Sequence, residues 1–324
     1  MTPCRQTWGV VLAAGDGTRL ASLTTDSRGN AVPKQFCSLH GESSLLHDAL
    51  RRAQPIVPRD RLCVVVAERH RRYWQEALWP LPERNVIVQP RNCGTAHGIL
   101  LTVLHILARD PQARIVFLPA DHYVRDEAAL ARGLTETAAL MSRHAQELLL
   151  LGIEPDEADP ELGYIVPGKR LAGGARTVEH FSEKPRRELA RELIARGALW
   201  NSFIFAAHGA TLLELLRERL PQTVTSMARA VALGVRDRHN ESLSVLYSAL
   251  ETIDFSRAIV QGAESRLRVV TAAACGWTDL GTPQRVIEAL QRPIAPAMAR
   301  RRTAAMAPAL INLAMQHARL QIRA

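Results

Sequence analysis

Aromatic side chains and long apolar runs are both scarce in this sequence of 324 residues. Phenylalanine, tryptophan and tyrosine together make up 5% of the residues, whereas proteins that bind single-stranded nucleic acid stack the bases on aromatic rings. No apolar run reaches the roughly 20 residues that a membrane-spanning helix needs. We therefore expect neither a nucleic-acid partner nor a membrane-spanning segment.

Cysteine is also infrequent, and its spacing argues against a fold stabilised by disulfides or by a zinc ion. The five cysteines lie far apart and form no Cys-x-x-Cys pair: Cys4, Cys37, Cys63, Cys93 and Cys275. An odd number at such spacings favours free thiols in a reducing compartment over a disulfide framework or a zinc site. The apolar run Val10–Ala14 stops at a glycine turn instead of forming the core of a secretory leader. We therefore expect a cytoplasmic protein.

The charge balance is basic, with a formal net charge of +9 and a pI of about 9.9. A basic surface fits phosphate-containing ligands, and equally RNA, DNA or an anionic membrane. Arginine supplies most of the excess and is spread along the chain, apart from the run Arg300–Arg302, which is typical of a solvated helix face. An RNA-binding module would need clustered arginines with interleaved aromatic residues. The charge therefore favours small anionic ligands.

Short apolar runs alternate with amphipathic segments of helical length in the first half of the chain. Five runs are predicted to be strands: Gly9–Ala14, Leu62–Ala67, Val86–Gln89, Ile115–Leu118 and Leu148–Ile153. The segments between them are predicted to be helices: Ser43–Gln54, His70–Leu78, Thr95–Ala108 and Glu127–His144. Apolar strands separated by helices are typical of a mostly parallel sheet covered on both faces. We therefore predict an α/β fold in three layers.

The pattern changes after Ile153. Residues 154–174 are rich in proline, glycine and acidic residues, which predicts a loop and a hairpin that leave the main sheet. Further strands are expected at 177–183, 199–206 and 268–273, and helices at 185–196 and onward to about residue 250. The last roughly 40 residues are rich in alanine, arginine and leucine and are expected to be helical. The simplest organisation is one α/β unit with an inserted, ligand-facing subdomain.

A glycine turn directly follows the first predicted strand. The sequence Gly15-Asp16-Gly17-Thr18-Arg19 matches neither the P-loop nor the dinucleotide-binding pattern. Its glycines would let backbone N–H groups approach phosphate oxygens, which Arg19 could clamp. A plain tight turn is the alternative. A second cation, Lys34, follows on a loop fixed by Pro33, and this favours a polyphosphate pocket at the carboxyl end of the strand.

Two acidic residues each follow a predicted strand. Asp121 stands in the segment Leu118–His122, and Asp279 stands in Gly276–Gly281. Carboxylates at strand ends face the crevice in which open α/β sheets bind ligands, and they suit Mg²⁺ beside phosphates. Two acids on one metal would serve phosphoryl or nucleotidyl transfer. For Asp121 alone a helix N-cap is the alternative, and we expect His122 to orient or pack rather than to bind metal.

Two shorter polar segments lie between these acids. Lys184 follows Glu183 at the end of a predicted strand and could hold a second phosphate group. Glu183 and Asn201 could exchange hydrogen bonds with sugar hydroxyl groups. A surface salt bridge and a turn asparagine are the alternative interpretations.

Taken in order, these segments resemble the sugar-1-phosphate nucleotidyltransferase family and, within it, the mannose-1-phosphate guanylyltransferases. The family's L-A-G-G-x-G-T-R-L, P-K-Q-F and P-x-D-H patterns correspond to Leu12–Leu20, Pro33–Phe36 and Pro119–His122. Its E-K-P, W-N-S and W-x-D-[LV]-G patterns correspond to Glu183–Pro185, Trp200–Ser202 and Trp277–Gly281. Further similarities occur at Gln89–Ala96, Leu151–Pro155, Gly163–Ile165 and Ile253–Phe255. The similarity extends over about residues 8–290.

The resemblance implies a Rossmann-like nucleotidyltransferase fold and a division of the chain. It implies one catalytic domain over residues 1–290, with its sugar-facing part at about 154–265, and a helical extension over 291–324. The implied reaction is the Mg²⁺-dependent attack of mannose 1-phosphate on GTP, which gives GDP-mannose and pyrophosphate. The implied partners are these small molecules, and a homo-oligomer stays open.

The resemblance also assigns roles to individual residues. Catalysis falls to Arg19, Lys34, Asp121, Lys184 and Asp279, of which Asp121 and Asp279 would bind Mg²⁺. The nucleotide would lie against Leu12, Ala13, Ala14, Gly15, Asp16, Gly17, Thr18, Gln89, Arg91, Gly94 and Thr95. The sugar would face Gly163, Glu183 and Asn201. In this scheme Arg19 holds the β- and γ-phosphates, Lys34 the α-phosphate and Lys184 the sugar phosphate.

Two departures from the family pattern concern the choice of substrate. Phe203 stands where many members have glycine after W-N-S, and the segment around Cys93 carries one residue more than the R-N-T-A pattern. A different pair, such as glucose 1-phosphate with UTP or dTTP, is therefore the enzymatic alternative. A non-catalytic sensor of GDP-sugars is the other alternative, but the presence of both Asp121 and Asp279 favours an enzyme.

Overall fold

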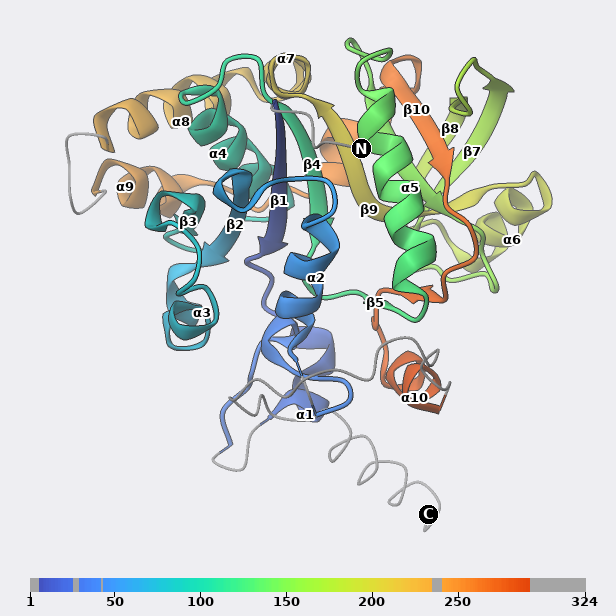
Figure 1. The fold of residues 1–324 in the computed structure, drawn as a ribbon, viewed down its shortest axis with the longest axis horizontal. Coiled ribbons are helices and arrows are strands. Elements are labelled where there is room, and N and C mark those ends of the chain that lie inside the picture. The colour runs from blue at the N-terminus through green and yellow to red at the C-terminus, as the bar shows by residue number, and fades with distance from the viewer. Residues whose placement is uncertain (1–5, 26–28, 42, 235–240, 292–324) are drawn as a thin grey trace.

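One large β-sheet organises the chain in the computed structural model, which describes residues 6–25, 29–41, 43–234 and 241–291 (Figure 1). Its strand order is β3-β2-β1-β4-β9-β6-β10-β8-β7. The strands are β1 (Thr7–Ala13), β2 (Leu62–Ala67), β3 (Val86–Gln89), β4 (Arg114–Pro119), β6 (Leu148–Ile153), β7 (Gly163–Arg170), β8 (Arg176–Glu183), β9 (Leu199–His208) and β10 (Leu267–Thr271). A separate two-stranded ribbon pairs β5 (Tyr123–Val124) with β11 (Trp277–Thr278).

The first half of the sheet is parallel. β1 runs parallel to β2 and to β4, and β2 runs parallel to β3. The register places Gly9 opposite Leu62, and Val11 opposite Leu118. Every residue of β2 is buried, because helices cover both faces of this half and leave no exposed face for polar side chains. The predicted α/β fold is confirmed.

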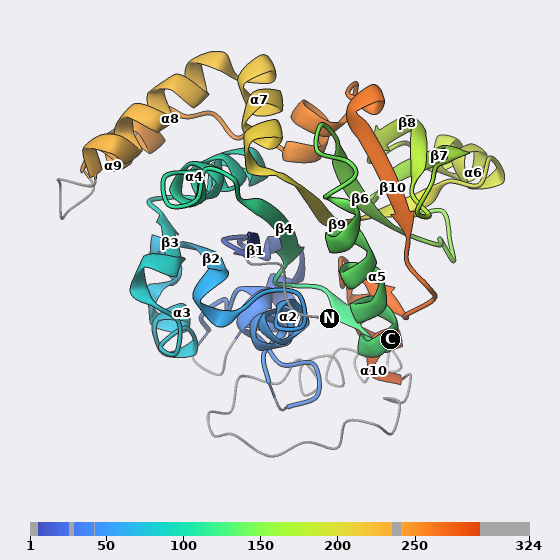
Figure 2. The ribbon, with the colours of Figure 1, turned by 45° about the horizontal axis from the view of Figure 1, so that its top comes forward.

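Helices lie on both faces of the sheet and enclose two cores (Figures 1 and 2). The helices are α1 (Ala21–Thr24), α2 (Leu45–Ala53), α3 (Arg71–Ala77), α4 (Thr95–Leu107), α5 (Glu127–Leu140), α6 (Arg187–Ala195), α7 (Gly209–Arg219), α8 (Pro221–Gly234), α9 (Glu241–Ala249) and α10 (Pro283–Gln291). One core takes side chains from α2, α3, α5 and α10, and the other takes them from α4, α7, α8 and α9. On β1, Val11 faces the first core and Val10 the second, as the alternation of side chains along a strand requires.

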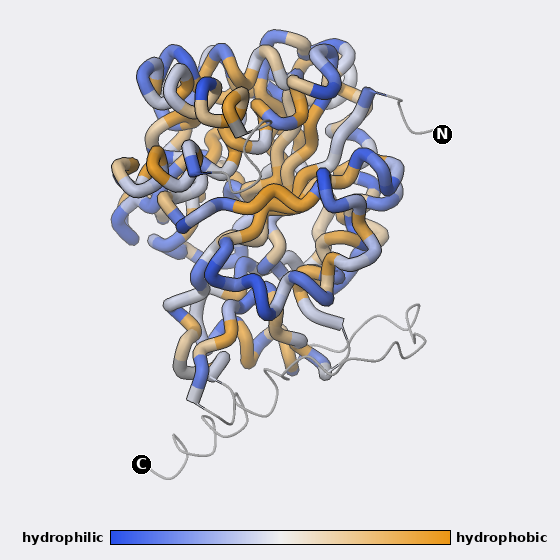
Figure 3. The backbone as a smooth tube through the Cα atoms, turned by 90° about the vertical axis from the view of Figure 1, so that its left-hand side faces the viewer, coloured by the Kyte–Doolittle hydropathy of each residue, from blue (hydrophilic) through white to orange (hydrophobic). Residues whose placement is uncertain are grey.

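Hydropathy follows this layering. Figure 3 shows the most hydrophobic parts of the backbone tube in the middle of the molecule, where the strands run, and hydrophilic segments around them. Burial of apolar surface is favourable by about 25 cal/mol per Å², so the apolar strands stabilise the sheet that carries the site. Within the described part of the chain, no helix is both long and apolar enough to cross a membrane.

The second half of the sheet is mixed. β9 runs antiparallel between β4 and β6, whereas β10 runs parallel to β6 and antiparallel to β8. The β7–β8 hairpin pairs with both β10 and β9, so the expectation that this hairpin leaves the main sheet is wrong. An edge strand presents unpaired backbone N–H and C=O groups, and the hairpin extends the ladder by satisfying them.

Two further expectations concern the chain end and the thiols. The predicted extension over 291–324 lies outside the described residues except for Gln291, which ends α10. The described cysteines are free, as predicted, and all are buried: Cys37, Cys63, Cys93 and Cys275. Cys4 lies outside the described residues. The boundaries of the sugar-facing part at 154–265 stay a prediction.

Candidate active site

A cavity of about 350 Å³ opens at the carboxyl ends of β1, β3 and β4. Most residues predicted for the site line it: Leu12, Ala14, Gly15, Arg19, Gln89, Gly94, Thr95, Asp121, Gly163, Glu183, Lys184, Asn201 and Asp279. Open α/β sheets bind ligands at this end of their strands. The structure therefore brings the predicted phosphate, base and sugar residues together in one cavity.

The glycine turn is held by the buried amide of Gln35, which itself lines the cavity. Gln35 is 2% exposed, and its Nε2 donates to the carbonyl oxygens of Ala13 and Gly15, each at 2.8 Å. These bonds hold the chain where it leaves β1. Ala13 thus supports the turn, although it is not among the residues that line the cavity.

Side chains of the turn itself also serve as anchors. The Asp16 carboxylate pairs with Arg69 and accepts a hydrogen bond from Asn92 Nδ2 at 3.1 Å. Gly17 has a φ of 64°, in the left-handed region that favours glycine, and a Cβ there would lie 2.9 Å from the Lys34 backbone nitrogen. Asp16 and Gly17, which were predicted for the nucleotide, therefore fix the turn. Neither they nor Thr18, which was also predicted for the nucleotide, are among the residues that line the cavity.

Lys34 joins the two predicted metal ligands. It is 4% exposed, and its Nζ lies 3.0 Å from Asp121 Oδ2 and donates to the Asp279 carbonyl oxygen at 2.6 Å. Burial raises the pKa of Asp121, but Lys34 and His122 lower it by more, so it lies below the ordinary value. Burial also raises the pKa of Asp279, but Lys34, His122 and Arg285 together lower it by more, so it too lies below the ordinary value. Both carboxyl groups are therefore ionised at neutral pH.

The tautomer of His122 follows from its neighbours. Trp277 Nε1 lies 3.2 Å from His122 Nδ1, and an indole N–H can only donate, so Nδ1 accepts and the ring proton sits on Nε2. That nitrogen lies 3.7 Å from Asp121 Oδ1. Burial lowers the pKa of His122 to about 4, so the ring is neutral at pH 7. The neutral ring therefore lies beside the Asp121 carboxylate at a distance longer than a hydrogen bond.

The donor set at Asp121 and Asp279 fits a magnesium ion. Among the described residues, no group of three or more His, Cys, Asp or Glu side chains could hold a metal ion by itself. Mg²⁺ is commonly held by one or two carboxylates together with substrate phosphates and water. Both carboxylates line the cavity, so they fit an ion that arrives with a polyphosphate. The all-oxygen set does not suit zinc, which favours His and Cys.

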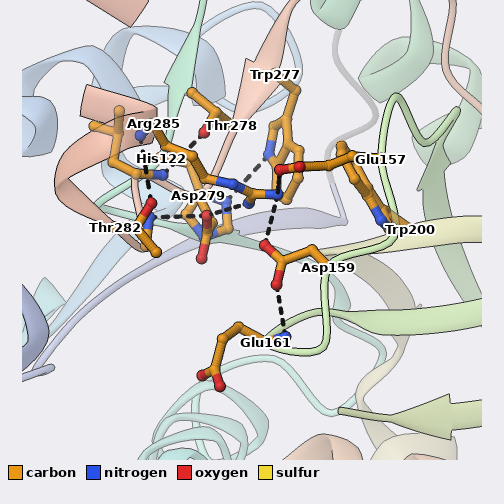
Figure 4. Close-up of polar contacts among 12 residues, drawn as sticks. His122, Glu157, Asp159, Glu161, Trp200, Trp277, Thr278, Asp279, Thr282 and Arg285 are labelled. Atoms are coloured by element: carbon orange, nitrogen blue, oxygen red, sulfur yellow. Dashed lines mark hydrogen bonds and ion pairs between the residues drawn. The ribbon is translucent and has the colours of Figure 1, made fainter. Parts of the chain in front are cut away.

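Asp279 also belongs to a cluster of buried charges (Figure 4). Its Oδ1 accepts from Arg285 Nη1 at 2.8 Å and from the Gly281 N–H at 2.9 Å. Its Oδ2 lies 3.7 Å from Arg19 Nη2. One carboxylate oxygen is therefore occupied by the protein, and the other faces a cation of the cavity.

Gln89 lies at the predicted base end of the cavity. It is 2% exposed, and its Oε1 accepts from the Tyr247 hydroxyl at 3.2 Å. A Cβ at Gly98 would lie 3.0 Å from Gln89 Nε2, so the amide rests directly on the backbone of α4. Thr95 Oγ1 accepts from the Phe255 N–H at 2.8 Å. These contacts fix the amide of Gln89 and join α4 to the segment that carries Phe255.

Arg91 is not brought into the cavity. Its Nε donates to the carbonyl of Tyr247 at 2.7 Å, and its Nη2 donates to that of Leu250 at 2.8 Å and to that of Ser248 at 3.4 Å. Carbonyls in the last turn of a helix lack an intrahelical donor, so Arg91 caps α9. It supports the wall of the base end from outside.

The predicted sugar end combines titratable and neutral polar groups. Burial and the neighbouring Asp254 raise the pKa of Glu183 to about 7. Asn201 Nδ2 donates to Ser256 Oγ at 3.3 Å, and a Cβ at Gly163 would lie 2.6 Å from Glu183 Oε2. Near neutral pH this end therefore offers both hydrogen-bond donors and acceptors, as binding of a polyol requires.

Backbone strain is concentrated at the cavity. Three non-glycine residues of the described chain have a left-handed backbone: Lys184 with φ 50°, Phe203 with φ 58° and Leu280 with φ 50°. Lys184 and Phe203 line the cavity, and Leu280 follows a predicted metal ligand. Phe203 packs edge to face on Phe205 and Phe255. Such conformations cost about 1–3 kcal/mol each and persist where the surroundings hold them.

Several residues of the cavity were not predicted from the sequence: Asn92, Glu161, Thr252, Asp254 and Ser256. The similarity at Ile253–Phe255 to a family pattern was a signal for Asp254. Glu161 stands in an acidic loop segment whose composition is also typical of solvent-exposed chain. Arg285 is an arginine in an amphipathic helix, and no local pattern distinguishes it from a surface cation.

Comparisons with known proteins identify the family of this chain. The Nucleotidyl transferase family matches residues 8–293. The xanthan biosynthesis protein XanB of Xanthomonas campestris pv. campestris is 31% identical over 279 residues, which cover 84% of this chain and 57% of that protein. Mannose-1-phosphate guanylyltransferase 2 of Escherichia coli O157:H7 is 30% identical over 290 residues, which cover 85% and 58% respectively. The chain thus spans a little over half the length of these relatives.

Solved structures show the same fold. A crystal structure described as a mannose-1-phosphate geranyltransferase from Thermus thermophilus has a TM-score of 0.74 at 29% identity, over 89% of this chain and 80% of that one. UDP-glucose pyrophosphorylase, complexed with UDP-glucose, has a TM-score of 0.58 at 16% identity, over 88% and 97%, which is a likeness of fold alone. The family resemblance predicted from the motifs is confirmed. The chain belongs to the nucleotidyl transferase family.

Proposed function

We propose that this chain transfers a nucleotidyl group from GTP to mannose 1-phosphate, giving GDP-mannose and pyrophosphate. The observation that carries the proposal is the position of Lys34, whose buried ammonium contacts the Asp121 carboxylate and the backbone carbonyl of Asp279. Both of these residues line the cavity together with Arg19 and Lys184. Such a cavity suits two phosphate-bearing substrates and a divalent cation. The name of the relative from Escherichia coli, mannose-1-phosphate guanylyltransferase 2, supports the substrate pair.

The phosphate-binding groups would act by positioning and charge neutralisation. Nucleotidyl transfer needs no covalent nucleophile from the protein, only in-line placement and stabilisation of developing charge. Arg19 and the backbone N–H groups of the glycine turn would hold the β- and γ-phosphates, which depart as pyrophosphate. The ammonium of Lys34 has three donors, and Asp121 and the Asp279 carbonyl take two. The third would serve the α-phosphate.

The second substrate would enter from the opposite end. Lys184 would hold the phosphate of the sugar so that its oxygen attacks the α-phosphorus in line with the departing pyrophosphate. Glu183 and Asn201 would bind the sugar hydroxyl groups, with the donors and acceptors described above. Lys184 directly follows β8, has a left-handed backbone and is among the residues that line the cavity, which supports this role.

Asp121 and Asp279 would hold a Mg²⁺ ion together with phosphate oxygens. When bound, the ion would offset negative charge on the α-phosphate and on the leaving pyrophosphate. Because neighbouring cations keep the pKa values of both carboxyl groups low, neither group would have to lose a proton at neutral pH in order to bind it.

A pyrophosphate-release assay over a matrix of substrates tests the proposal. The matrix combines GTP, ATP, UTP and dTTP with mannose, glucose and galactose 1-phosphates, each with and without Mg²⁺. We expect the fastest turnover with GTP and mannose 1-phosphate, and only with Mg²⁺. Faster turnover of another pair would replace these substrates. No turnover of any pair, despite tight binding of GDP-mannose, would replace the enzyme by a sensor.

The substitution Asp279→Asn tests the metal assignment. The amide keeps the shape of the side chain and can still accept from Arg285, but it is a neutral and weaker ligand for Mg²⁺. Because single electrostatic groups at a transition state contribute about 10²–10³ in rate, we expect kcat to fall by that factor while GTP binding survives in part. The control is Asp60→Asn, at an exposed aspartate. An Asp279→Asn enzyme as active as wild type would remove Asp279 from the metal site.

A further inference from the structure

Arg285, near the start of α10, is buried among acidic and aromatic side chains (Figure 4). It is 8% exposed. Its Nη1 donates to Asp279 Oδ1 at 2.8 Å, and its Nη2 lies 2.6 Å from Asp159 Oδ2 and 3.2 Å from Glu157 Oε1. Its Cζ lies 5.3 Å from the centre of the Trp200 ring. A planar guanidinium fixes the direction of each partner, which the point charge of an ammonium does not.

Asp159 is itself held by the sheet. The hydroxyl of Tyr164, on β7, accepts from the Asp159 N–H at 2.8 Å and donates to the Asp159 carbonyl at 3.0 Å. Trp200 Nε1 donates to the same hydroxyl at 3.2 Å. The hydroxyl thus uses its donor and both of its acceptor positions. Arg285 is therefore placed from β7 as well as from α10.

A closed ring of contacts joins Arg285 to the glycine turn. Asp159 Oδ1 accepts from the Glu161 N–H at 2.7 Å, and Glu161 Oε2 lies 3.5 Å from Arg19 Nη1. Arg19 Nη2 lies 3.7 Å from Asp279 Oδ2, and Asp279 returns to Arg285. We call these five residues the charge ring. It connects the loop before β7 with the phosphate side of the cavity.

Arg285 and Arg19 contact different oxygens of the Asp279 carboxylate. Arg285 is buried and bonds Asp279 at 2.8 Å, whereas the side chain of Arg19 is 50% exposed and lies 3.7 Å away. A buried carboxylate that loses its partner is costly and must find another cation. Without Arg285, Asp279 would turn toward Arg19. Asp279 Oδ2 would then no longer be available to bind a metal ion, and Arg19 would no longer be available to bind phosphates.

We propose that Arg285 is a positioning residue that occupies Asp279 Oδ1, so that Oδ2 stays available to a divalent cation and Arg19 to the triphosphate. The inference rests on the proposed function, because it concerns the metal ion and the triphosphate of that reaction. It goes beyond that function, because Arg285 contacts neither substrate in the proposed scheme and acts through Asp279.

Binding of Mn²⁺ in the presence of a non-hydrolysable GTP analogue tests this role without turnover. Free Mn²⁺ is followed by electron paramagnetic resonance with the full chain, and folding is followed by circular dichroism. Residues that hold metal ligands change metal affinity by about 10–100-fold, so we expect Arg285→Met to weaken Mn²⁺ binding by at least about tenfold. Arg285→Lys keeps the charge but not the fork, so its affinity should lie between those of Arg285→Met and wild type.

Arg268→Met is the matched control. Arg268 is likewise largely buried and pairs with Glu147 at 2.8 Å. It lies at the amino end of β10, however, whereas the cavity lies at the carboxyl ends of the parallel strands. This variant should lower the melting temperature and leave the affinity for Mn²⁺ unchanged. A general loss of stability is thereby separated from a loss of positioning.

The outcomes separate this inference from the proposed function. If the wild type binds no Mn²⁺ with the nucleotide, the proposed function fails and this inference fails with it. If the wild type binds Mn²⁺ and both Arg285 variants bind Mn²⁺ as tightly as the wild type does, only the positioning role of Arg285 is overturned. If Arg285→Met does not fold, Arg285→Lys decides: a folded lysine variant with weaker Mn²⁺ binding supports the role, and one with wild-type affinity overturns it.

Discussion

At the scale of the residue, Glu183 carries a carboxyl group whose charge changes within the working range of pH. Burial and Asp254 raise its pKa from 4.5 to about 7. The folded state therefore binds this proton more tightly than the unfolded chain does, and stability is lost as the pH rises from about 4.5 to 7. The loss is on the order of 3 kcal/mol, at 1.36 kcal/mol per pKa unit.

The substitution Glu183→Gln should remove this dependence. At pH 8 we expect the variant to be more stable than wild type by up to about 3 kcal/mol, and at pH 5 the difference should be much smaller. Urea unfolding at both pH values measures it. Glu179→Gln, at an exposed position of the same strand, should show no such change. A gain for Glu183→Gln that is equal at pH 5 and pH 8 would contradict the assignment.

Phe203 combines backbone strain with contact to the cavity. Its φ of 58° suits glycine better than an aromatic residue, and its ring lies beside Phe205 and Phe255. Phe203→Gly should relieve the strain and enlarge the sugar end. We expect the ratio of kcat/KM for N-acetylhexosamine 1-phosphates over mannose 1-phosphate to rise about tenfold, the order of one well-filled pocket contact.

Phe203→Ala separates the two effects. It removes the ring but keeps a Cβ in the left-handed region, so it should widen selectivity to a similar degree and be less stable than Phe203→Gly by about 1–2 kcal/mol. Thermal unfolding and a substrate series measure both quantities. Unchanged selectivity in both variants would show that Phe203 does not limit the sugar.

The sequence predicted residues of the site when they directly follow an apolar strand. Asp121 follows β4, so its place at the cavity depends only on where that strand ends. Arg91 also stands near the end of a strand, yet its guanidinium binds carbonyls of α9, more than a hundred residues later. Arg285 likewise owes its role to acids on a remote loop. Such pairings depend on tertiary packing, which local patterns do not encode.

At the scale of the element, α4 depends on a close approach at its first turn. Gly94 has a φ of 91°, and a Cβ there would lie 2.2 Å from the Ile253 carbonyl oxygen. The Ala96 N–H donates to that oxygen at 3.1 Å. Gly94→Ala would add both backbone strain and overlap, so we expect the free energy of unfolding to fall by about 2–5 kcal/mol.

Gly15→Ala is the matched control for that prediction. Gly15 has a negative φ, and a Cβ there would meet no atom within 4 Å. Its free energy of unfolding should stay within about 0.5 kcal/mol of wild type. Denaturant unfolding compares the two variants, and equal stability of both would show that the contact with Ile253 is not required.

Elements were predictable where one kind of residue dominates. β2 is apolar throughout because both of its faces are buried, and its predicted bounds coincide with the observed ones. A hairpin was predicted within residues 154–174 and a strand at 177–183, but the pairing of β7 with β8 and their attachment to β10 and β9 were not predicted. Residues 154–174 are polar enough for a surface excursion, and backbone pairing at a sheet edge leaves no mark in composition.

At the scale of the whole molecule, the net charge of +9 should affect how nucleotides bind. A positive field attracts a triphosphate, and salt screens that field over about 10 Å at 0.1 M. We therefore expect KM for GTP to rise severalfold between about 50 and 300 mM salt, with kcat nearly constant. Steady-state kinetics in NaCl and in potassium glutamate measure it. A KM independent of salt would show that only contacts inside the cavity matter.

The ribbon of β5 and β11 determines how the two carboxylates Asp121 and Asp279 can be displaced from the cavity. Tyr123 pairs with Thr278, and Trp277 pairs with Val124. Asp121 therefore lies two residues before β5, and Asp279 lies one residue after β11. A short ribbon that opens does so as a cooperative unit. Both carboxylates would then leave together, and slow amide hydrogen exchange at Tyr123 and Thr278 would mark the molecules in which the pair is intact.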